Sequence, residues 1–198
     1  MANWTRRQWL VSTLGLVAAS ATGVGVWYNK RYNHFAVHDA GMVYRSAWLK
    51  GEAFADLIDR HQIRSIVNLC NPGEMGAERC VDQRKYVEGS GAVLYDCTMP
   101  NTIDPSDPQV EKLVAILSDP KNYPMLVHCQ HGVTRTAKVL AMYDILYKGM
   151  SADDSLKRMP LFGRDDYSVS VYAFARNFEH KHAELYPQTA GKLDTLLR

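Results

Sequence analysis

The chain has 198 residues, of which 46% are hydrophobic and 22% charged. These values are close to the averages of globular proteins and exclude a disordered, collagen-like or polytopic membrane protein. The net charge of +2, from 23 basic and 21 acidic residues, is too small to predict a nucleic-acid partner. Four of the basic residues precede the first acidic one, Asp39, which leaves 19 basic against 21 acidic residues and a net charge of −2 from residue 35 onward.

Residues 1–32 are predicted to form an N-terminal signal or membrane anchor. The twenty residues from Trp9 to Tyr28 carry no charge, and as a helix they would span about 30 Å, the thickness of a bilayer core. Aromatic residues at both ends favour a retained anchor that contacts the membrane. Ala19-Ser20-Ala21 and the twin-arginine pair Arg6-Arg7 favour a cleaved export signal. Both interpretations target the protein to a membrane or across it. Arg6, Arg7 and the terminal amine narrowly outweigh Lys30 and Arg31, so the positive-inside bias favours a domain outside the cytoplasm, either periplasmic or anchored to the membrane.

Residues 33–198 are enough for one folded domain. The expected elements, in chain order, are a strand at 42–46, a helix at 51–61, a strand at 63–70, a helix at 77–88, a strand at 92–97, a helix from 108 to 117 capped by Asp107, a strand at 124–128, and helices at 135–148, 151–159 and 166–185. This alternation predicts an α/β sandwich with a central, mainly parallel sheet flanked by helices. Ligands of such sheets bind beyond the carboxyl ends of the strands.

The segment from His128 to Thr136 lies at such a position, directly after an apolar strand and before a helix. Its backbone amides and the helix N-terminus behind them suit an anion. Arg135 supplies a planar fork of donors that fits two phosphate oxygens. Cys129 stands at the strand end, where the helix dipole and Arg135 favour the reactive thiolate. None of the four cysteines belongs to a CxxC pair, so their spacing does not predict a zinc or dithiol site.

This segment resembles the His-Cys-x5-Arg-Ser/Thr signature of the cysteine-dependent protein tyrosine phosphatase superfamily. The compact domain resembles its dual-specificity branch, in particular bacterial exported members. Tyr44-Arg45-Ser46, Asn68-Leu69-Cys70 and Met99-Pro100 also look like their counterparts there, so the resemblance covers about residues 40–165. It implies a dual-specificity-phosphatase-like fold and a phosphatase catalytic domain over residues 33–198.

By this resemblance, Cys129 attacks phosphorus and forms a cysteinyl-phosphate, and Arg135 binds the phosphoryl oxygens. His128 is expected to orient the loop, and Thr136 to hydrogen-bond to the Cys129 sulfur. Neither a metal nor another cofactor is implied. The substrate-binding residues implied are Gln130, His131, Gly132, Val133, Thr134 and Arg135.

The family also uses an aspartic acid from a separate upstream loop as general acid and then base. Asp104 matches that loop position best. Asp107 is the second candidate, although its place before Pro108 also suits a helix cap. Asp96 lies inside a predicted strand, where the sheet fixes its direction.

Cys70 raises a separate hypothesis. A cysteine in the same Asn-Leu-Cys context of a phosphoinositide phosphatase in this superfamily can bridge the catalytic one, and such a bridge would make activity redox-dependent. The alternative is a buried small hydrophobic residue.

The resemblance implies a phosphorylated protein as substrate: phosphotyrosine and, given a shallow pocket, phosphoserine or phosphothreonine. Loop positions 130, 131, 133 and 134 carry no lysine, which disfavours polyanionic substrates. Two alternatives stay open. One is an arsenate reductase that uses the same loop with Cys70 or Cys97 as resolving thiol; the other is a membrane-tethered pseudophosphatase that binds phosphopeptides.

Overall fold

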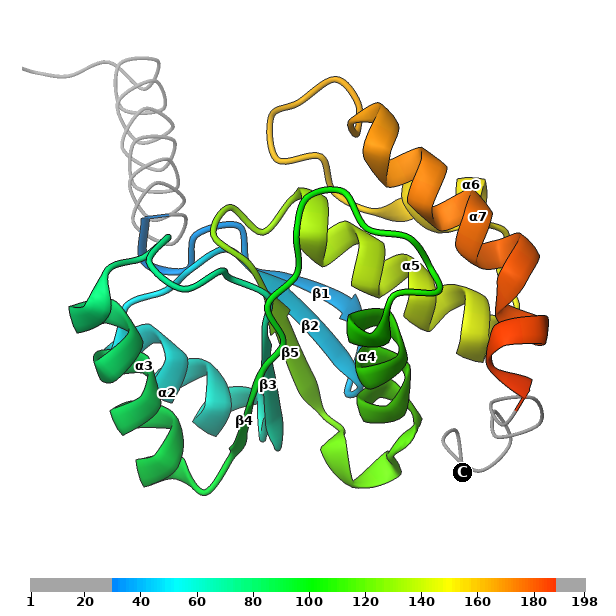
Figure 1. Ribbon diagram of the computed structural model, residues 1–198. Coiled ribbons are helices and arrows are strands. Elements are labelled where there is room, and N and C mark those ends of the chain that lie inside the picture. Colours follow the sequence, from blue (N-terminus) through cyan, green and yellow to red (C-terminus); the bar gives the residue numbers. More distant parts are fainter. Residues whose placement is uncertain (1–29, 188–198) are drawn as a thin grey trace, which may run out of the picture.

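The computed structural model describes residues 30–187 (Figure 1). The predicted signal or anchor therefore lies outside the described residues, apart from its last three positions. Within residues 30–187 no helix is long and apolar enough to cross a bilayer.

A five-stranded sheet with the order β1-β2-β5-β3-β4 forms the centre of the domain. The strands are β1 (Ala36–Asp39), β2 (Val43–Ser46), β3 (Ser65–Asn68), β4 (Val93–Asp96) and β5 (Met125–His128). Neighbouring strands are parallel except for β1, which runs antiparallel to β2 at the edge. The predicted, mainly parallel α/β sandwich is confirmed.

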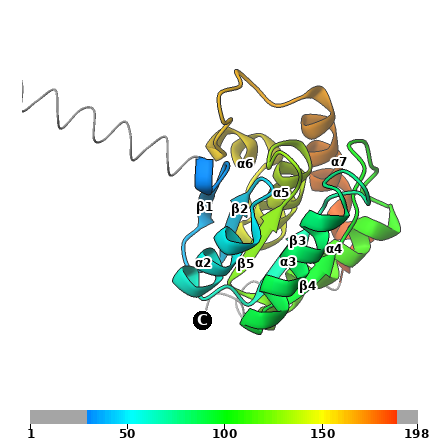
Figure 2. The same cartoon turned by 90° about the vertical axis from the view of Figure 1, so that its left-hand side faces the viewer.

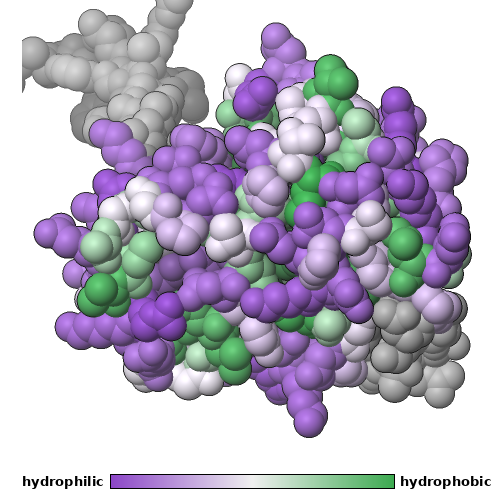
Figure 3. Space-filling view, viewed as in Figure 1, coloured by the Kyte–Doolittle hydropathy of each residue, from purple (hydrophilic) through white to green (hydrophobic). Residues whose placement is uncertain are grey.

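Helices cover both faces of the sheet. α2 (Gly51–His61) and α3 (Ala77–Ser90) lie on one face (Figure 2). On the other side lie α4 (Pro108–Ser118) and α5 (Thr134–Lys148), and α6 (Ala152–Arg158) and α7 (Val169–Leu185) pack against α5. The short helix η1 (Pro120–Asn122) precedes β5. Alternation along each strand sends Ile66 and Leu126 to the first core but Val67 and Val127 to the second. The surface view in Figure 3 is mainly hydrophilic, with hydrophobic residues in small separate groups.

Most predicted boundaries hold within two residues. Asp107 caps α4 as expected, because its carboxylate accepts a hydrogen bond from Gln109 N at 2.8 Å. The last helix begins at Val169 rather than 166, since the residues before its N-cap Ser168 form a loop. β1 was not predicted, because four residues at a half-exposed sheet edge show little hydrophobic periodicity.

A buried polar cluster fastens β1 to the helices behind it. At its centre is the carboxylate of Asp144 on α5, which is fully buried. It bonds His38 Nε2 at 2.9 Å, Ser155 Oγ at 2.6 Å and Arg158 Nη2 at 2.6 Å. Burial raises the pKa of Asp144, but the bonds from His38 and Arg158 outweigh it and hold the pKa below its ordinary value. The buried charge is thus matched within the cluster.

Candidate active site

Residues His128–Thr136, which we name the Cys129 loop, connect the end of β5 to the first turn of α5. Cys129 is 2% exposed at the strand end, and Arg135 is buried in the first helical turn. The structure therefore places both at the carboxyl edge of the parallel strands, where the sequence predicts a site.

The carbonyl oxygens of the Cys129 loop are bonded from outside by neighbouring segments. Because a trans peptide points its N–H away from the preceding C=O, the following amides face the inside of the loop. Within residues 30–187, no backbone hydrogen bond uses the N–H of residues 130 to 133. The inner side is thus a row of free donors, as an anion cradle requires. The outer contacts are Trp48 N to Gln130 O (3.2 Å), His34 Nδ1 to His131 O (2.8 Å) and Arg45 Nη2 to Gly132 O (2.5 Å).

Gly132 forms the tip of the loop, where no other residue fits. Its φ of +64° lies in the left-handed region. A Cβ there would stand 2.5 Å from Ser46 O and from Ala47 N. The end of β2 therefore sets the position of the loop.

The Arg135 guanidinium is held at two points. Its Nη1 donates to Leu69 O at 2.9 Å, and its Nη2 pairs with Glu74 Oε2 at 2.8 Å. Burial raises the pKa of Glu74, but the hydrogen bonds from Arg135 and Asn71 outweigh it and hold the pKa below its ordinary value. Glu74 thus stays ionised and orients the arginine fork.

His128 is a neutral support of the loop. Complete burial, between Trp48 and Phe54, lowers its pKa to about 3. Gln83 Nε2 donates to its Nε2 at 2.7 Å. These contacts fit the predicted orienting role. The Thr136 hydroxyl is also buried, but it has no hydrogen-bond partner within residues 30–187, so the predicted bond to the Cys129 sulfur is not formed here.

All four cysteines are free thiols. Burial, and then the nearby Cys129 sulfur, raises the pKa of Cys70 to about 12. Burial also raises the pKa of Cys97. Both thiols are therefore protonated at neutral pH, which disfavours either as an attacking or resolving thiol. The redox role of Cys70 stays a prediction.

The structure does not bring the candidate general acid to the loop. Asp104 lies on the β4–α4 loop, residues 97–107, where its carboxylate is exposed and accepts hydrogen bonds from Ser106 N (2.9 Å) and Oγ (2.7 Å). Lys181 Nζ on α7 lies 3.8 Å away. The bonds from Ser106, and then the charge of Lys181, lower the pKa of Asp104. Its assignment as general acid stays a prediction.

The other two aspartates have structural partners. Asp107 caps α4, as described. Asp96 ends β4 and contacts Arg84 at 2.7 Å and Asn68 at 2.9 Å. Its direction is fixed by the sheet, as expected.

Several residues near the loop were not singled out as site residues from the sequence. Arg45 and Glu74 contact the loop directly, as described. His34 stacks on Phe162 with ring centroids 4.5 Å apart, and both residues have positive φ. The Arg45 guanidinium lies over the same ring at 5.0 Å. Of these residues, only Arg45 belongs to a motif noted in the sequence, Tyr44-Arg45-Ser46. No sequence pattern pointed to the others.

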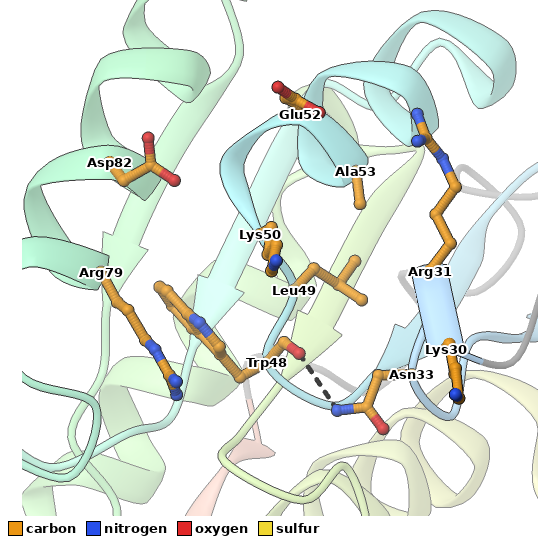
Figure 4. Close-up of a pocket in the computed structure, with 10 residues that line it drawn as sticks. All are labelled: Lys30, Arg31, Asn33, Trp48, Leu49, Lys50, Glu52, Ala53, Arg79 and Asp82. Carbon is orange, nitrogen blue, oxygen red and sulfur yellow. Dashed lines mark hydrogen bonds between the residues drawn. The ribbon is translucent and has the colours of Figure 1, made fainter.

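A pocket of about 510 Å³ adjoins the loop through Trp48. Its basic side chains come from separate segments: Arg79 from α3, Lys50 before α2, and Lys30 and Arg31 near the N-terminal edge. Figure 4 shows Arg79 beside the Trp48 ring, with Lys30 and Arg31 on the opposite side. Glu52 and Asp82 also line it, so the pocket is mixed in charge with a basic excess.

The fold and the Cys129 loop are those of one class of proteins, the cysteine-dependent phosphatases of the dual-specificity type. Within that class, the chain belongs to the family described as "DSP-PTPase phosphatase fused to NAD+ Kinase", whose model matches residues 43–177. It is therefore a phosphatase of the DSP/PTP superfamily.

Two curated relatives are inositol diphosphatases. DSP3 of Arabidopsis thaliana is 30% identical over 108 residues, 52% of this chain and 50% of that protein. SIW14 of Saccharomyces cerevisiae is 30% identical over 103 residues, 50% of this chain and 35% of that protein. The chain thus spans half or less of the length of these relatives.

Solved structures share the fold. The core catalytic domain of the PP-IP phosphatase SIW14 from S. cerevisiae, in complex with citrate, matches with a TM-score of 0.64 at 23% identity, covering 80% of this chain and 93% of that one. A variant of P. aeruginosa TpbA in complex with pTyr matches with a TM-score of 0.53 at 18% identity, covering 85% and 97%.

Proposed function

We propose that this chain hydrolyses phosphotyrosine in proteins through a cysteinyl-phosphate on Cys129, and accepts phosphoserine or phosphothreonine more slowly. The observation that carries the proposal is the Cys129 loop: a cradle of free amides with one arginine and no lysine, flanked by aromatic rings of His34 and Phe162. Such a cradle suits one phosphate group on an aryl ester better than a densely charged ligand.

In the first step, the Cys129 thiolate attacks phosphorus, so that the S–P bond forms as the bond to the tyrosine oxygen breaks. The loop amides and the Arg135 fork bind the three non-bridging oxygens, whose interactions strengthen in the transition state. The leaving oxygen takes a proton from Asp104 once the β4–α4 loop brings that carboxyl to the site.

In the second step, the Asp104 carboxylate takes a proton from water as the water oxygen attacks phosphorus. The S–P bond breaks, inorganic phosphate leaves, and the Cys129 thiolate is restored. The catalytic groups in this scheme are all side chains or backbone amides of this chain.

A second candidate function is hydrolysis of an inositol diphosphate, and the basic pocket next to the loop favours it. Lys50 and Arg79 would bind additional phosphates while the Cys129 loop takes the one that is transferred. The activity named for DSP3 and SIW14 is of this kind.

A paired assay tests the two functions on one preparation. We expect kcat/KM for a phosphotyrosine peptide to exceed that for an inositol diphosphate, with no turnover of either by Cys129→Ser. In the Lys50→Ala/Arg79→Ala double variant, peptide hydrolysis should stay within about twofold. Faster hydrolysis of the inositol diphosphate, lost selectively in the double variant, would establish the second function instead.

We also propose that residues 1–32 export or anchor the protein, on the sequence pattern given above. Expression of the full chain followed by cell fractionation and N-terminal sequencing separates the forms. A mature N-terminus near residue 22 indicates cleavage, and intact protein in the membrane fraction indicates an anchor. Intact protein in the cytosolic fraction would exclude both.

A further inference from the structure

Arg45 is a fully buried cation at the end of β2. Its guanidinium donates to Gly132 O at 2.5 Å and to Tyr167 Oη at 3.4 Å, and it lies over the Phe162 ring at 5.0 Å. All three partners are neutral. Two of them belong to the loop before α7, so Arg45 joins that loop to the tip of the Cys129 loop.

No carboxylate pairs with Arg45 within the described part of the chain. A buried charge without a counter-charge is strongly destabilising. The buried charge of Asp144 is matched by Arg158, so the fold does pair such groups elsewhere. Burial lowers the pKa of Arg45, while Tyr167 and the Cys129 sulfur act in the opposite direction. The anionic partner available to Arg45 is therefore in the reaction site: the Cys129 thiolate or a bound phosphate.

We propose that Arg45 is a positioning residue of the phosphatase reaction, which fixes the Gly132 peptide and supplies the buried counter-charge for the anion in the Cys129 loop. The bond to Gly132 O directs the next amide N–H into the cradle. Gly132 packs closely against the backbone of Ser46 and Ala47, which fixes the position of the tip of the Cys129 loop. The effect should grow in the transition state, where negative charge spreads over the phosphoryl oxygens. This role holds for any phosphate ester, whichever substrate is physiological.

The test compares Arg45→Met, Arg45→Lys and a matched control, Arg158→Met, which removes an arginine from the Asp144 cluster. For each we would measure kcat and KM on a chromogenic aryl phosphate. We would also measure inhibition constants for inorganic phosphate and for orthovanadate, which adopts the five-coordinate geometry of the transition state. Thermal melting reports any loss of stability.

In Arg45→Met we expect kcat to fall by about tenfold or more while KM stays within about threefold. Orthovanadate inhibition should weaken by at least about tenfold, and phosphate inhibition by less than about threefold. Arg45→Lys keeps the charge but loses the fork, so it should recover most of the orthovanadate affinity. Arg158→Met should melt earlier without changing the ratio of the two inhibition constants.

Equal weakening of both inhibitors in Arg45→Met, or an unchanged kcat with a lower melting temperature, would overturn the proposal. If Arg45→Met does not fold, Arg45→Gln decides, because its amide can still donate to Gly132 O but carries no charge. It should lower kcat and orthovanadate affinity together, while Arg45→Lys keeps most of both. Unchanged values in Arg45→Gln would assign Arg45 a purely structural role.

Discussion

The Cys129 loop and the β4–α4 loop are the two segments that the sequence marks for the reaction, and they are held in very different ways. Most of the Cys129 loop is buried, and β2, His34, Gln83 and Glu74 fasten it from several sides. The β4–α4 loop is largely exposed. Cys97 and Met99 at its start are buried. The rest is fastened to the helices at few points: Lys138 Nζ bonds Asn101 O, Tyr186 Oη bonds Pro105 O at 2.5 Å, and Lys181 Nζ lies 3.8 Å from Asp104.

In the proposed reaction, the two loops would have different tasks. Phosphate binding and nucleophilic attack need fixed geometry, which many mutually supporting contacts provide. Delivery of a proton needs a group that can reach the substrate after it binds, and a sparsely fastened loop can move at low cost. The comparison predicts that changes in the Cys129 loop damage every substrate, whereas changes in the β4–α4 loop damage those with poor leaving groups.

The largest effect is expected from Cys129→Ser. A serine hydroxyl does not ionise at neutral pH as a reactive cysteine thiol does. Turnover of any phosphate ester should therefore fall by about 10⁴-fold or more. Stopped and continuous assays on an aryl phosphate, with circular dichroism to show an unchanged fold, check this. Turnover comparable with wild type would remove the nucleophile from the scheme.

Asp104→Asn should reduce kcat by about 10²-fold for phenyl phosphate, because the amide cannot donate a proton to the leaving oxygen. The loss should be much smaller for a nitrophenyl ester, whose leaving group needs little protonation. Asp107→Asn is the matched control on the same loop: asparagine also caps helices, so activity should stay within about twofold. If the two variants exchanged their effects, Asp107 would be the acid.

Gly132→Ala should lower kcat by about tenfold or more for all esters alike, because the added Cβ displaces the loop from Ser46 and Ala47. Gly149→Ala is its control. Gly149 has a similar φ of +60° with nothing within 4 Å of an added Cβ, so it tests backbone strain alone. We expect the two variants to lower the melting temperature by similar amounts, but Gly149→Ala to keep normal kcat. A similar loss of kcat in both variants would argue that the exact position of the Cys129 loop is not what matters.

The smallest effect is a shift in pH dependence from Ser106→Ala. Hydrogen bonds from Ser106 lower the pKa of Asp104, and a general acid works only below its pKa. Loss of the Ser106 hydroxyl raises that pKa, so the basic limb of the kcat profile should move to higher pH, with little change at its acidic plateau. A move to lower pH, or none, would indicate that another group forms this limb.

The sequence predicted the helices and nearly all of the sheet well, because buried strands and amphipathic helices carry strong periodicity. The division into two cores, one on each face of the sheet, was not predicted. β1 was not predicted, because its four residues show no local pattern. Tertiary contacts, such as that of His38 with Asp144, hold this strand in place.

For the candidate site, the sequence located Cys129 and Arg135, whose chemistry depends on spacing within one loop. It did not locate Glu74, His34 or Phe162 as neighbours, because strands and loops far apart in the chain bring them together. Nor could it show that Asp104 faces Lys181, since the direction of an exposed loop depends on what it packs against.

The antiparallel direction of β1 also has a practical consequence. Ala36 lies opposite Arg45, near the end of β2, so the chain enters the domain at the same edge as Cys129. α7 ends far from that edge (Figure 1). A bead, tag or fusion partner attached just ahead of Lys30 would therefore crowd the approach of large substrates. The same attachment after α7 would leave it open, so protein used for substrate capture is best immobilised through the C-terminus.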